Sequence, residues 1–279
     1  MDGSQRPTAP GWMLGHMGSG DASEAGAAGA ARAARGALAA LGAAWELAFP
    51  LSCGGCGRYG EAWCGQCTSE TGVPGAAPRP VRLDLRAAPR TWAAGEFSGP
   101  LARGLTAYKD QDRRDLAAVF GPALRRTVDR AALAWNEPRR VLVVPVPATR
   151  RARNRRGDVP LDGLVRVALR DGRARMSTSG VAGEPQVLTF ARLLRTRGRV
   201  RDQRELTREQ RAENVHGSMH VTGVREVGPS AWPPVIVVDD VCTTGATLAE
   251  AARALHAAGA REVVAAVVAA TPARGRDLP

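Results

Sequence analysis

The stretch Val235–Leu248 constrains the fold most, because it joins an apolar run to two adjacent acids and a loop of small residues. Val235–Val238 is a continuous β-branched run, which is typical of a strand buried on both faces of a parallel sheet. We expect Asp239 and Asp240 to end this strand. Leu248–Ala258 then repeats apolar residues at helical spacing and is followed by glycine, which predicts a helix. The stretch therefore predicts a strand, an acidic pair, a loop and a helix in that order.

The loop between the acids and the helix has the chemistry of a phosphate site. A helix N-terminus offers free N–H groups and the positive end of the helix dipole. Gly245 and Ala246 allow a phosphate to approach the backbone, and Thr243, Thr244 and Thr247 add hydroxyl donors. The two carboxylates before the loop accept hydrogen bonds only, which suits sugar hydroxyls. An ordinary capped turn explains one such residue, whereas the whole series predicts a ribose 5-phosphate site.

This series closely resembles the phosphoribosyl pyrophosphate (PRPP) signature of type I phosphoribosyltransferases. The resemblance implies that Asp239 and Asp240 hold the ribose diol and are the candidate catalytic residues. It implies that residues 243–247 hold the 5-phosphate. It also implies that Arg150 and the loop 145–149 bind pyrophosphate together with Mg²⁺, a cation that bridges phosphates.

Lys109 is the only lysine in a chain that otherwise uses arginine as its basic residue. One interpretation is a solvated side chain at the end of a helix. The other is a ligand of pyrophosphate, because a compact ammonium suits a pyrophosphate oxygen where a planar guanidinium does not fit. We favour the second interpretation.

Four of the five cysteines form two Cys-x-x-Cys pairs, Cys53 with Cys56 and Cys64 with Cys67. Four thiolates at this spacing suit a tetrahedral structural zinc. The alternative is two disulfides or free thiols, and disulfides are disfavoured in a cytoplasmic chain. Cys242 lies in the loop after the acids, where we interpret it as a small packing residue, neither nucleophile nor ligand.

The rest of the chain predicts an α/β fold: a parallel sheet flanked by helices, as in type I phosphoribosyltransferases, preceded by a small four-cysteine zinc module. Its binding site should lie at the carboxyl ends of the strands. We expect a disordered tail over 1–29, a short helix and the zinc module over 30–72, a linker over 71–89 and the phosphoribosyltransferase-like domain over 90–279. Further strands are expected at 92–97, 141–144, near 221 and at 263–270, and helices at 99–109, 113–128 and much of 193–214.

The formal net charge of +12 and the arginines gathered between Arg150 and Arg211 favour acidic partners, either phosphorylated substrates or nucleic acid. Aromatic residues are only 4%, so the sequence shows no platform for stacking single-stranded bases. No run is long and apolar enough to span a membrane, and the alanine-rich segment 27–50 lacks the apolar core of a signal peptide. We therefore expect a cytoplasmic protein without membrane insertion.

The four-cysteine module, the Tyr108-Lys109 segment and the PRPP-like loop together resemble the ComF family (the ComFC or GntX type) of bacterial phosphoribosyltransferase-like proteins. That resemblance implies a role in competence and uptake of single-stranded DNA, with a helicase partner; some relatives are linked instead to nutrient use. One departure is that Arg156-Gly157 is followed by Asp158-Val159-Pro160, where the family has Phe-Asn-Gln. Further matches are Leu194-Arg195-Thr196-Arg197, Gln203, Leu206, Arg211, Asn214-Val215 and Gly217.

Two hypotheses follow. In the first the chain is an enzyme, a phosphoribosyltransferase of the glycosyltransferase class whose acceptor the sequence does not reveal. In the second the fold is retained without catalysis, and the chain binds DNA or a protein partner. Fold alone does not choose between them.

Overall fold

The computed structural model describes residues 51–83, 85, 87–135, 140–148, 159–170, 187–197, 216–223 and 232–271. The predicted tail, the expected helix before residue 50, Arg150 and most of the arginine-rich segment lie outside these residues. The described residues all belong to one compact unit.

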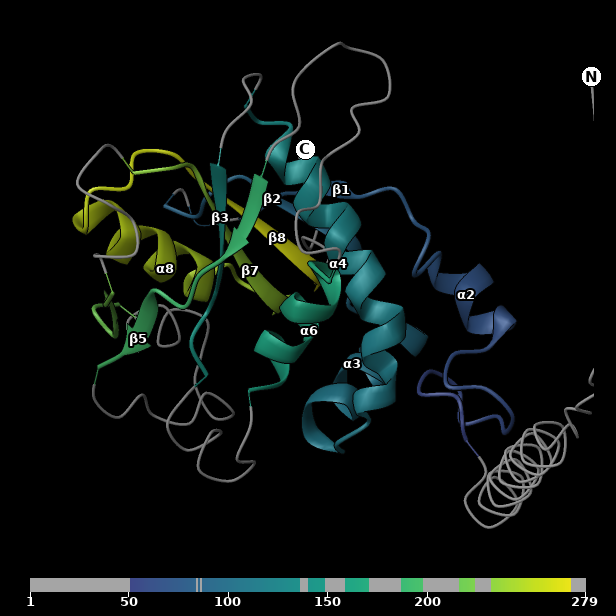
Figure 1. Ribbon diagram of the computed structural model, residues 1–279. Helices are drawn as coiled ribbons and strands as arrows, with labels where there is room; N and C mark the ends of the chain where they lie inside the picture. Colours follow the sequence, from purple (N-terminus) through teal and green to yellow (C-terminus); the bar gives the residue numbers. More distant parts are fainter. Residues whose placement is uncertain are drawn as a thin grey trace, which may run out of the picture. The chain divides into compact units, whose positions relative to one another are not determined.

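A mostly parallel sheet forms the centre of this unit, with the strand order β1-β2-β8-β7-β3-β4 in the described residues (Figure 1). Only the pairing of β1 with β2 is antiparallel. Its strands are β1 (Arg79–Val81), β2 (Thr91–Glu96), β3 (Arg140–Pro145), β4 (Val187–Phe190), β7 (Val235–Cys242) and β8 (Val263–Ala270).

The central strands are those with the longest β-branched or alanine runs. Val237 of β7 lies opposite Val144 on one side and Ala265 on the other, and all three side chains are buried. Strands covered on both faces need apolar residues at every position, which is why these runs do not alternate with polar residues. The parallel sheet flanked by helices is the predicted fold class.

Helices cover both faces of the sheet. Helices α3 (Gly99–Asp110), α4 (Ala117–Ala132) and α6 (Pro160–Ala168) lie on one side, and α8 (Ala246–Ala257) lies on the other (Figure 1). Gly259, with φ +107°, follows α8 as the sequence predicts. A short 3₁₀ turn, Arg114–Leu116, separates α3 from α4, although the sequence pattern predicts a helix that begins at Arg113.

Two expectations about strands are wrong. Asp239 and Asp240 do not end β7, which continues to Cys242 because Ala270 of β8 still pairs with it there. Within the predicted helix 193–214, Leu194–Thr196 is instead a strand, β5, that pairs antiparallel with β6 (Met219–Val221). The buried Leu194 side chain favours the hairpin over a solvated helix.

Several elements were not predicted. Neither α6 nor β4 was anticipated, and β1 lies within the segment predicted to be a linker. No element was predicted in the cysteine module, where α2 (Gly65–Thr71) begins between the two cysteines of the second pair and contains Cys67.

Candidate functional site

Strand β7 and helix α3 bring an acidic pair and the single lysine together at the carboxyl edge of the sheet. Lys109 Nζ lies 2.9 Å from Asp240 Oδ1 and 2.8 Å from Oδ2. The Lys109 side chain is 47% exposed, whereas that of Asp240 is only 8% exposed. Asp239 is also buried, and its Oδ1 accepts the N–H of Asp240 at 2.8 Å. The contact joins residues 131 positions apart, and it brings together three predicted site residues.

The pKa values of the two carboxyl groups are shifted in opposite directions. Burial raises the pKa of Asp239 well above its ordinary value, and the neighbouring charge of Asp240 adds to this effect. Burial also acts to raise the pKa of Asp240, but the Lys109 ammonium outweighs it and lowers that pKa. Lys109 in turn has a raised pKa, because the two carboxylates outweigh its partial burial. Asp240 therefore loses its proton more readily than Asp239, and its charge faces the Lys109 ammonium.

The packing of the last turns of α3 positions Lys109. The hydroxyl of Tyr108, a buried residue, donates to the Pro160 carbonyl at 2.7 Å. The Arg114 guanidinium lies over the Tyr108 ring and donates to the Tyr108 carbonyl. Tyr108, the residue before Lys109, is thus fixed on two sides. Lys109 therefore points from a rigid helix end toward β7.

The loop after β7 leads into the N-terminus of α8. Gly245 adopts φ +81°, a conformation open to glycine, and it precedes the first residue of α8. A Cβ at this position would lie 2.9 Å from Leu83. Thr243 is exposed, and Thr244 and Thr247 are half-buried. The Thr244 hydroxyl accepts the Ala246 N–H at 3.3 Å. The first turn of α8 and three hydroxyls are therefore gathered at one helix N-terminus.

The segment after β3 lies directly beside this site. Val146 N–H donates to the Val238 carbonyl at 3.0 Å, one residue before the acidic pair. This hydrogen bond uses the Val146 N–H, and Pro145 and Pro147 have none. The described part of the expected pyrophosphate loop, residues 145–148, therefore offers few backbone donors. Thr149 and Arg150 lie beyond the residues that the structure describes.

Cys242 is buried at the end of β7. Burial raises the pKa of its thiol to about 12, and the nearby Asp239 adds to that effect. Its thiol therefore stays protonated at neutral pH, as expected of a packing residue rather than a nucleophile.

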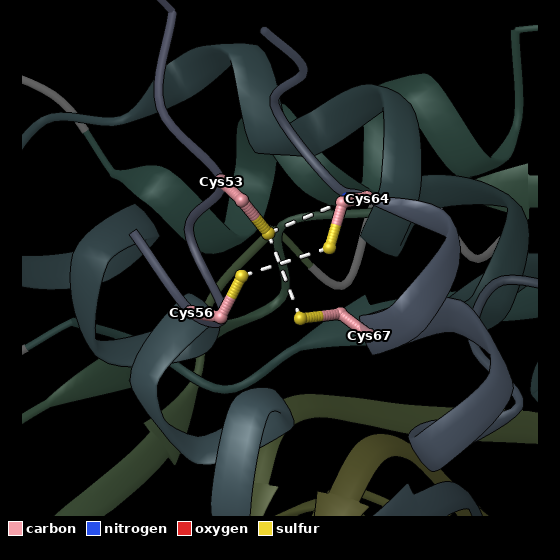
Figure 2. Close-up of side chains that lie close together, drawn as sticks. All are labelled: Cys53, Cys56, Cys64 and Cys67. Atoms are coloured by element: carbon pink, nitrogen blue, oxygen red, sulfur yellow. Dashed lines mark hydrogen bonds between the residues drawn. The ribbon is translucent and has the colours of Figure 1, made fainter. Parts of the chain in front are cut away.

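The four remaining cysteines converge on one point (Figure 2). The Sγ atoms of Cys53 and Cys67 are 3.6 Å apart, as are those of Cys56 and Cys64, and all four lie within 4.8 Å of one another. A tetrahedral zinc with Zn–S bonds of about 2.3 Å places its sulfurs about 3.8 Å apart. The cluster therefore fits a structural metal such as zinc.

The thiols have unequal acidity in this cluster. Burial acts to raise the pKa of Cys53, but backbone N–H groups, first that of Cys64, outweigh it and hold this pKa at about 6. The Cys64 N–H lies 3.3 Å from the Cys53 sulfur. Burial raises the pKa of Cys67, and its hydrogen bond to Cys53 raises it further. An N–H donor aimed at sulfur stabilises a thiolate, which is the metal-binding form.

The cysteine module packs on α3. The Trp63 ring meets the Phe120 ring edge to face, with centroids 5.5 Å apart, and Gly104 leaves room for it. Arg103 donates to the Gly55 carbonyl, and Arg113 Nη2 donates to the Ser52 carbonyl at 2.7 Å. The carbonyls of Ser52 and Gly55, just before and within the first Cys-x-x-Cys pair, are thus held by side chains from the domain that carries the acidic site.

Sequence reasoning missed two buried acids near the site. Glu250 of α8, 3% exposed, accepts the Met219 N–H of β6 at 2.8 Å and pairs with Arg253. Asp162 of α6, 5% exposed, pairs with Arg192. The sequence signal for both is an acidic residue at a helix position that the periodic pattern turns toward the core. Such a residue requires a buried partner.

The comparison with protein families matches the same part of the chain. The model for the phosphoribosyl transferase domain matches residues 232–278. The matched segment includes β7, the threonine loop, α8 and β8. The matched segment and the mostly parallel sheet that contains it are therefore phosphoribosyltransferase-like in fold. No curated protein matches the chain.

In the described part of the chain, no helix combines the length and the apolar character needed to cross a membrane.

Proposed function

We propose that the carboxyl edge of the sheet binds PRPP, or a ligand that carries ribose 5-phosphate, with Mg²⁺. The observation that carries this proposal is the Lys109–Asp240 pair beside Asp239, near the end of β7. Two threonines follow in the loop, and a third lies in the first turn of α8. Burying two adjacent carboxyl groups is unfavourable, and such arrangements occur mainly where function requires them. Acceptors for a diol and donors for a phosphate occur here on consecutive residues of one chain segment.

Different residues contact the ribose, the 5-phosphate and the pyrophosphate of the ligand. Asp239 and Asp240 accept hydrogen bonds from the ribose hydroxyls, and Thr243–Thr247 donate to the 5-phosphate. Lys109 pairs with Asp240 in the free protein. Because its side chain is half-exposed, it can turn toward a pyrophosphate oxygen when the ribose occupies Asp240. Mg²⁺ entering with PRPP would supply positive charge that offsets the charge of the pyrophosphate.

The proposed reaction is phosphoribosyl transfer. The bond between ribose C1 and the pyrophosphate oxygen breaks, pyrophosphate leaves with the electron pair, and a nucleophilic acceptor bonds to C1. The Asp240 charge favours the positive ribose that develops in the transition state. The remaining contribution is the positioning of the two reactants. No general base is assigned among the described residues.

Calorimetry of the full chain with PRPP and Mg²⁺ tests this proposal. We expect saturable one-to-one binding, with ribose 5-phosphate binding more weakly because it lacks the pyrophosphate. Pyrophosphate release would then be followed with candidate acceptors. Absence of binding by either ligand to folded, metal-loaded protein would refute the site. Binding without pyrophosphate release from any acceptor would instead favour a ligand-binding module that has lost catalysis.

We further propose the finer assignment to the ComF type of phosphoribosyltransferase-like protein, acting in the cytoplasm in competence and DNA uptake with a helicase partner. The four-cysteine module packed on the domain, together with the sequence resemblance, supports it. The net charge of +12 supports contact with single-stranded DNA. Binding through phosphates weakens steeply as salt rises. Oligonucleotide binding that is absent at low salt, or insensitive to salt, would count against the DNA role.

A further inference from the structure

The connection between β1 and β2, residues 82–90, packs against the threonine loop, residues 243–247. The structure describes this connection except for residues 84 and 86. A Cβ added at Gly245 would lie 2.9 Å from Cδ1 and 3.4 Å from Cδ2 of Leu83, and 3.4 Å from the Cβ of Ala88. The backbone of Gly245 is therefore in direct contact with a segment that lies far away along the chain.

The β1–β2 connection is anchored to the sheet. Val81, just before it, pairs with Thr91, just after it. Within it, the Ala88 N–H donates to the Leu85 carbonyl at 3.0 Å, which closes a turn. The Leu83 side chain is half-buried and packs against the edge of the hydrophobic core. The connection therefore presents Leu83 to the threonine loop from a fixed position.

Gly245 leaves room for this contact. Its φ of +81° is a conformation that residues with a Cβ rarely adopt. Its carbonyl accepts the Ala249 N–H at 2.8 Å, so the conformation of Gly245 also sets where α8 begins. A side chain at this position would have to displace Leu83. The glycine thus serves the packing of the chain on itself, on the side of its Cα that Leu83 covers.

The threonine loop needs support from outside. It is polar, and Thr243 is exposed, so it has few apolar contacts of its own to hold its shape. Hydroxyl and N–H donors bind a phosphate more tightly when they are in place before the ligand arrives, because ordering them on binding costs free energy. Leu83 supplies an apolar contact at Gly245, between Thr244 and Thr247.

We infer that the β1–β2 connection braces the threonine loop, and that Leu83 is a positioning residue for the 5-phosphate. Leu83 acts through Gly245, and its hydrocarbon side chain has no group that could bind the phosphate itself. The inference rests on the proposed function, because the braced loop is the one assigned to the 5-phosphate. The connection lies outside residues 232–278, the segment that matches the phosphoribosyl transferase model.

Calorimetric titration of the full, metal-loaded chain with PRPP and with ribose 5-phosphate tests the inference. Leu83→Ala should weaken both ligands by the same factor, about threefold to tenfold, because both carry the 5-phosphate. Leu83→Met nearly conserves the side-chain volume and should restore the wild-type affinities. Leu85→Ala is the matched control and should bind both ligands as the wild type does. Leu85 is a half-buried leucine of the same connection, but none of its atoms is among the three nearest to the Cβ position of Gly245.

A double-mutant cycle with Gly245→Ala separates bracing from a general loss of packing. The added Cβ strains the loop in any background, but it meets the Leu83 side chain only where that leucine is present. Gly245→Ala should therefore weaken ribose 5-phosphate binding by a factor at least about twofold larger in the wild type than in Leu83→Ala. Where binding is too weak to titrate, the urea midpoints of the same four ligand-free proteins measure the same coupling.

The outcomes separate this inference from the proposed function. Equal loss of both ligands in Leu83→Ala, rescue by methionine and coupling in the cycle support it. Wild-type affinity in folded Leu83→Ala, an equal loss in Leu85→Ala, or additive effects in the cycle overturn it and leave the proposed function standing. A loss of PRPP affinity without a loss of ribose 5-phosphate affinity also overturns it, because Leu83 would then act on the pyrophosphate end. Failure of the wild-type chain to bind either ligand refutes the proposed function, and the inference fails with it.

Discussion

The acidic pair gives the sharpest prediction, because the structure makes its two members unequal. Asp240 pairs with Lys109, which lowers its pKa, whereas burial raises the pKa of Asp239 and favours its neutral form. A hydrogen bond to a charged acceptor contributes about 1.5–3 kcal/mol, and one to a neutral acceptor about 0.5–1.5 kcal/mol. Because asparagine still offers a neutral acceptor oxygen, Asp240→Asn loses the difference of about 1–1.5 kcal/mol and should weaken PRPP binding about fivefold to tenfold, whereas Asp239→Asn should weaken it about twofold at most.

Calorimetric titration of each variant with PRPP, ribose 5-phosphate and inorganic phosphate measures these losses. Phosphate binding should survive in both variants, or improve in Asp240→Asn as negative charge is removed. Asp129→Asn is the matched control, an acid paired with Arg125 on α4, and it should bind PRPP as the wild type does. Circular dichroism confirms that each variant is folded. If folded Asp240→Asn binds PRPP as tightly as the wild type, the carboxylates are structural and the proposed site is wrong.

Three further predictions concern metal, pH and packing. Purified protein should contain about one zinc per chain; Cys56→Ser should lose it and Cys242→Ser should keep it, and equal zinc in both variants would contradict the assignment. Because burial raises the pKa of Asp239, its ionisation opposes folding. As pH rises from about 4, the ordinary carboxyl pKa, the ligand-free wild type should lose stability relative to Asp239→Asn. Urea titrations measure both free energies of unfolding, and a difference between the two proteins that stays constant with pH would refute this. Glu250→Ala leaves the Met219 N–H and Arg253 without their acceptor and should lower the free energy of unfolding by about 1–3 kcal/mol; an unchanged urea midpoint would contradict it.

The sequence predicted the parts of the fold that depend on local patterns. The run Val263–Ala270 reads as a buried strand because every residue is apolar, and the structure gives that strand the same bounds. The cysteine spacing likewise predicts the cluster. Neither result needs knowledge of distant residues.

Features that depend on distant contacts were harder to predict. Leu194–Thr196 forms a strand only because β6, more than 20 residues later, supplies its hydrogen-bond partners. The pairing of Glu250 with Met219 spans 31 residues, and periodicity carries no information about such a partner. Lys109 was identified by its rarity, but its contact with Asp240 follows from the topology, which places the end of α3 beside the carboxyl edge of β7.

The cysteine module and the acidic site share helix α3, and this arrangement predicts that metal affects ligand binding. Arg103 holds the Gly55 carbonyl, and Lys109 lies six residues later, about 9 Å along the same helix. The Trp63 ring packs against the Phe120 ring, and Gly104 of α3 lies against both rings. Loss of the metal should loosen these contacts and the position of the Lys109 ammonium.

Protein treated with a chelator under reducing conditions should therefore bind PRPP several-fold more weakly, while binding of inorganic phosphate at the threonine loop changes little. Restoring zinc should restore PRPP affinity. The Lys109→Met variant provides the control, because it lacks the ammonium through which the effect acts and its PRPP affinity should respond less to metal removal. Equal PRPP affinity of folded wild-type protein with and without metal would show that the module does not position Lys109. The role of the cysteine module would then be confined to stabilising its own two Cys-x-x-Cys loops.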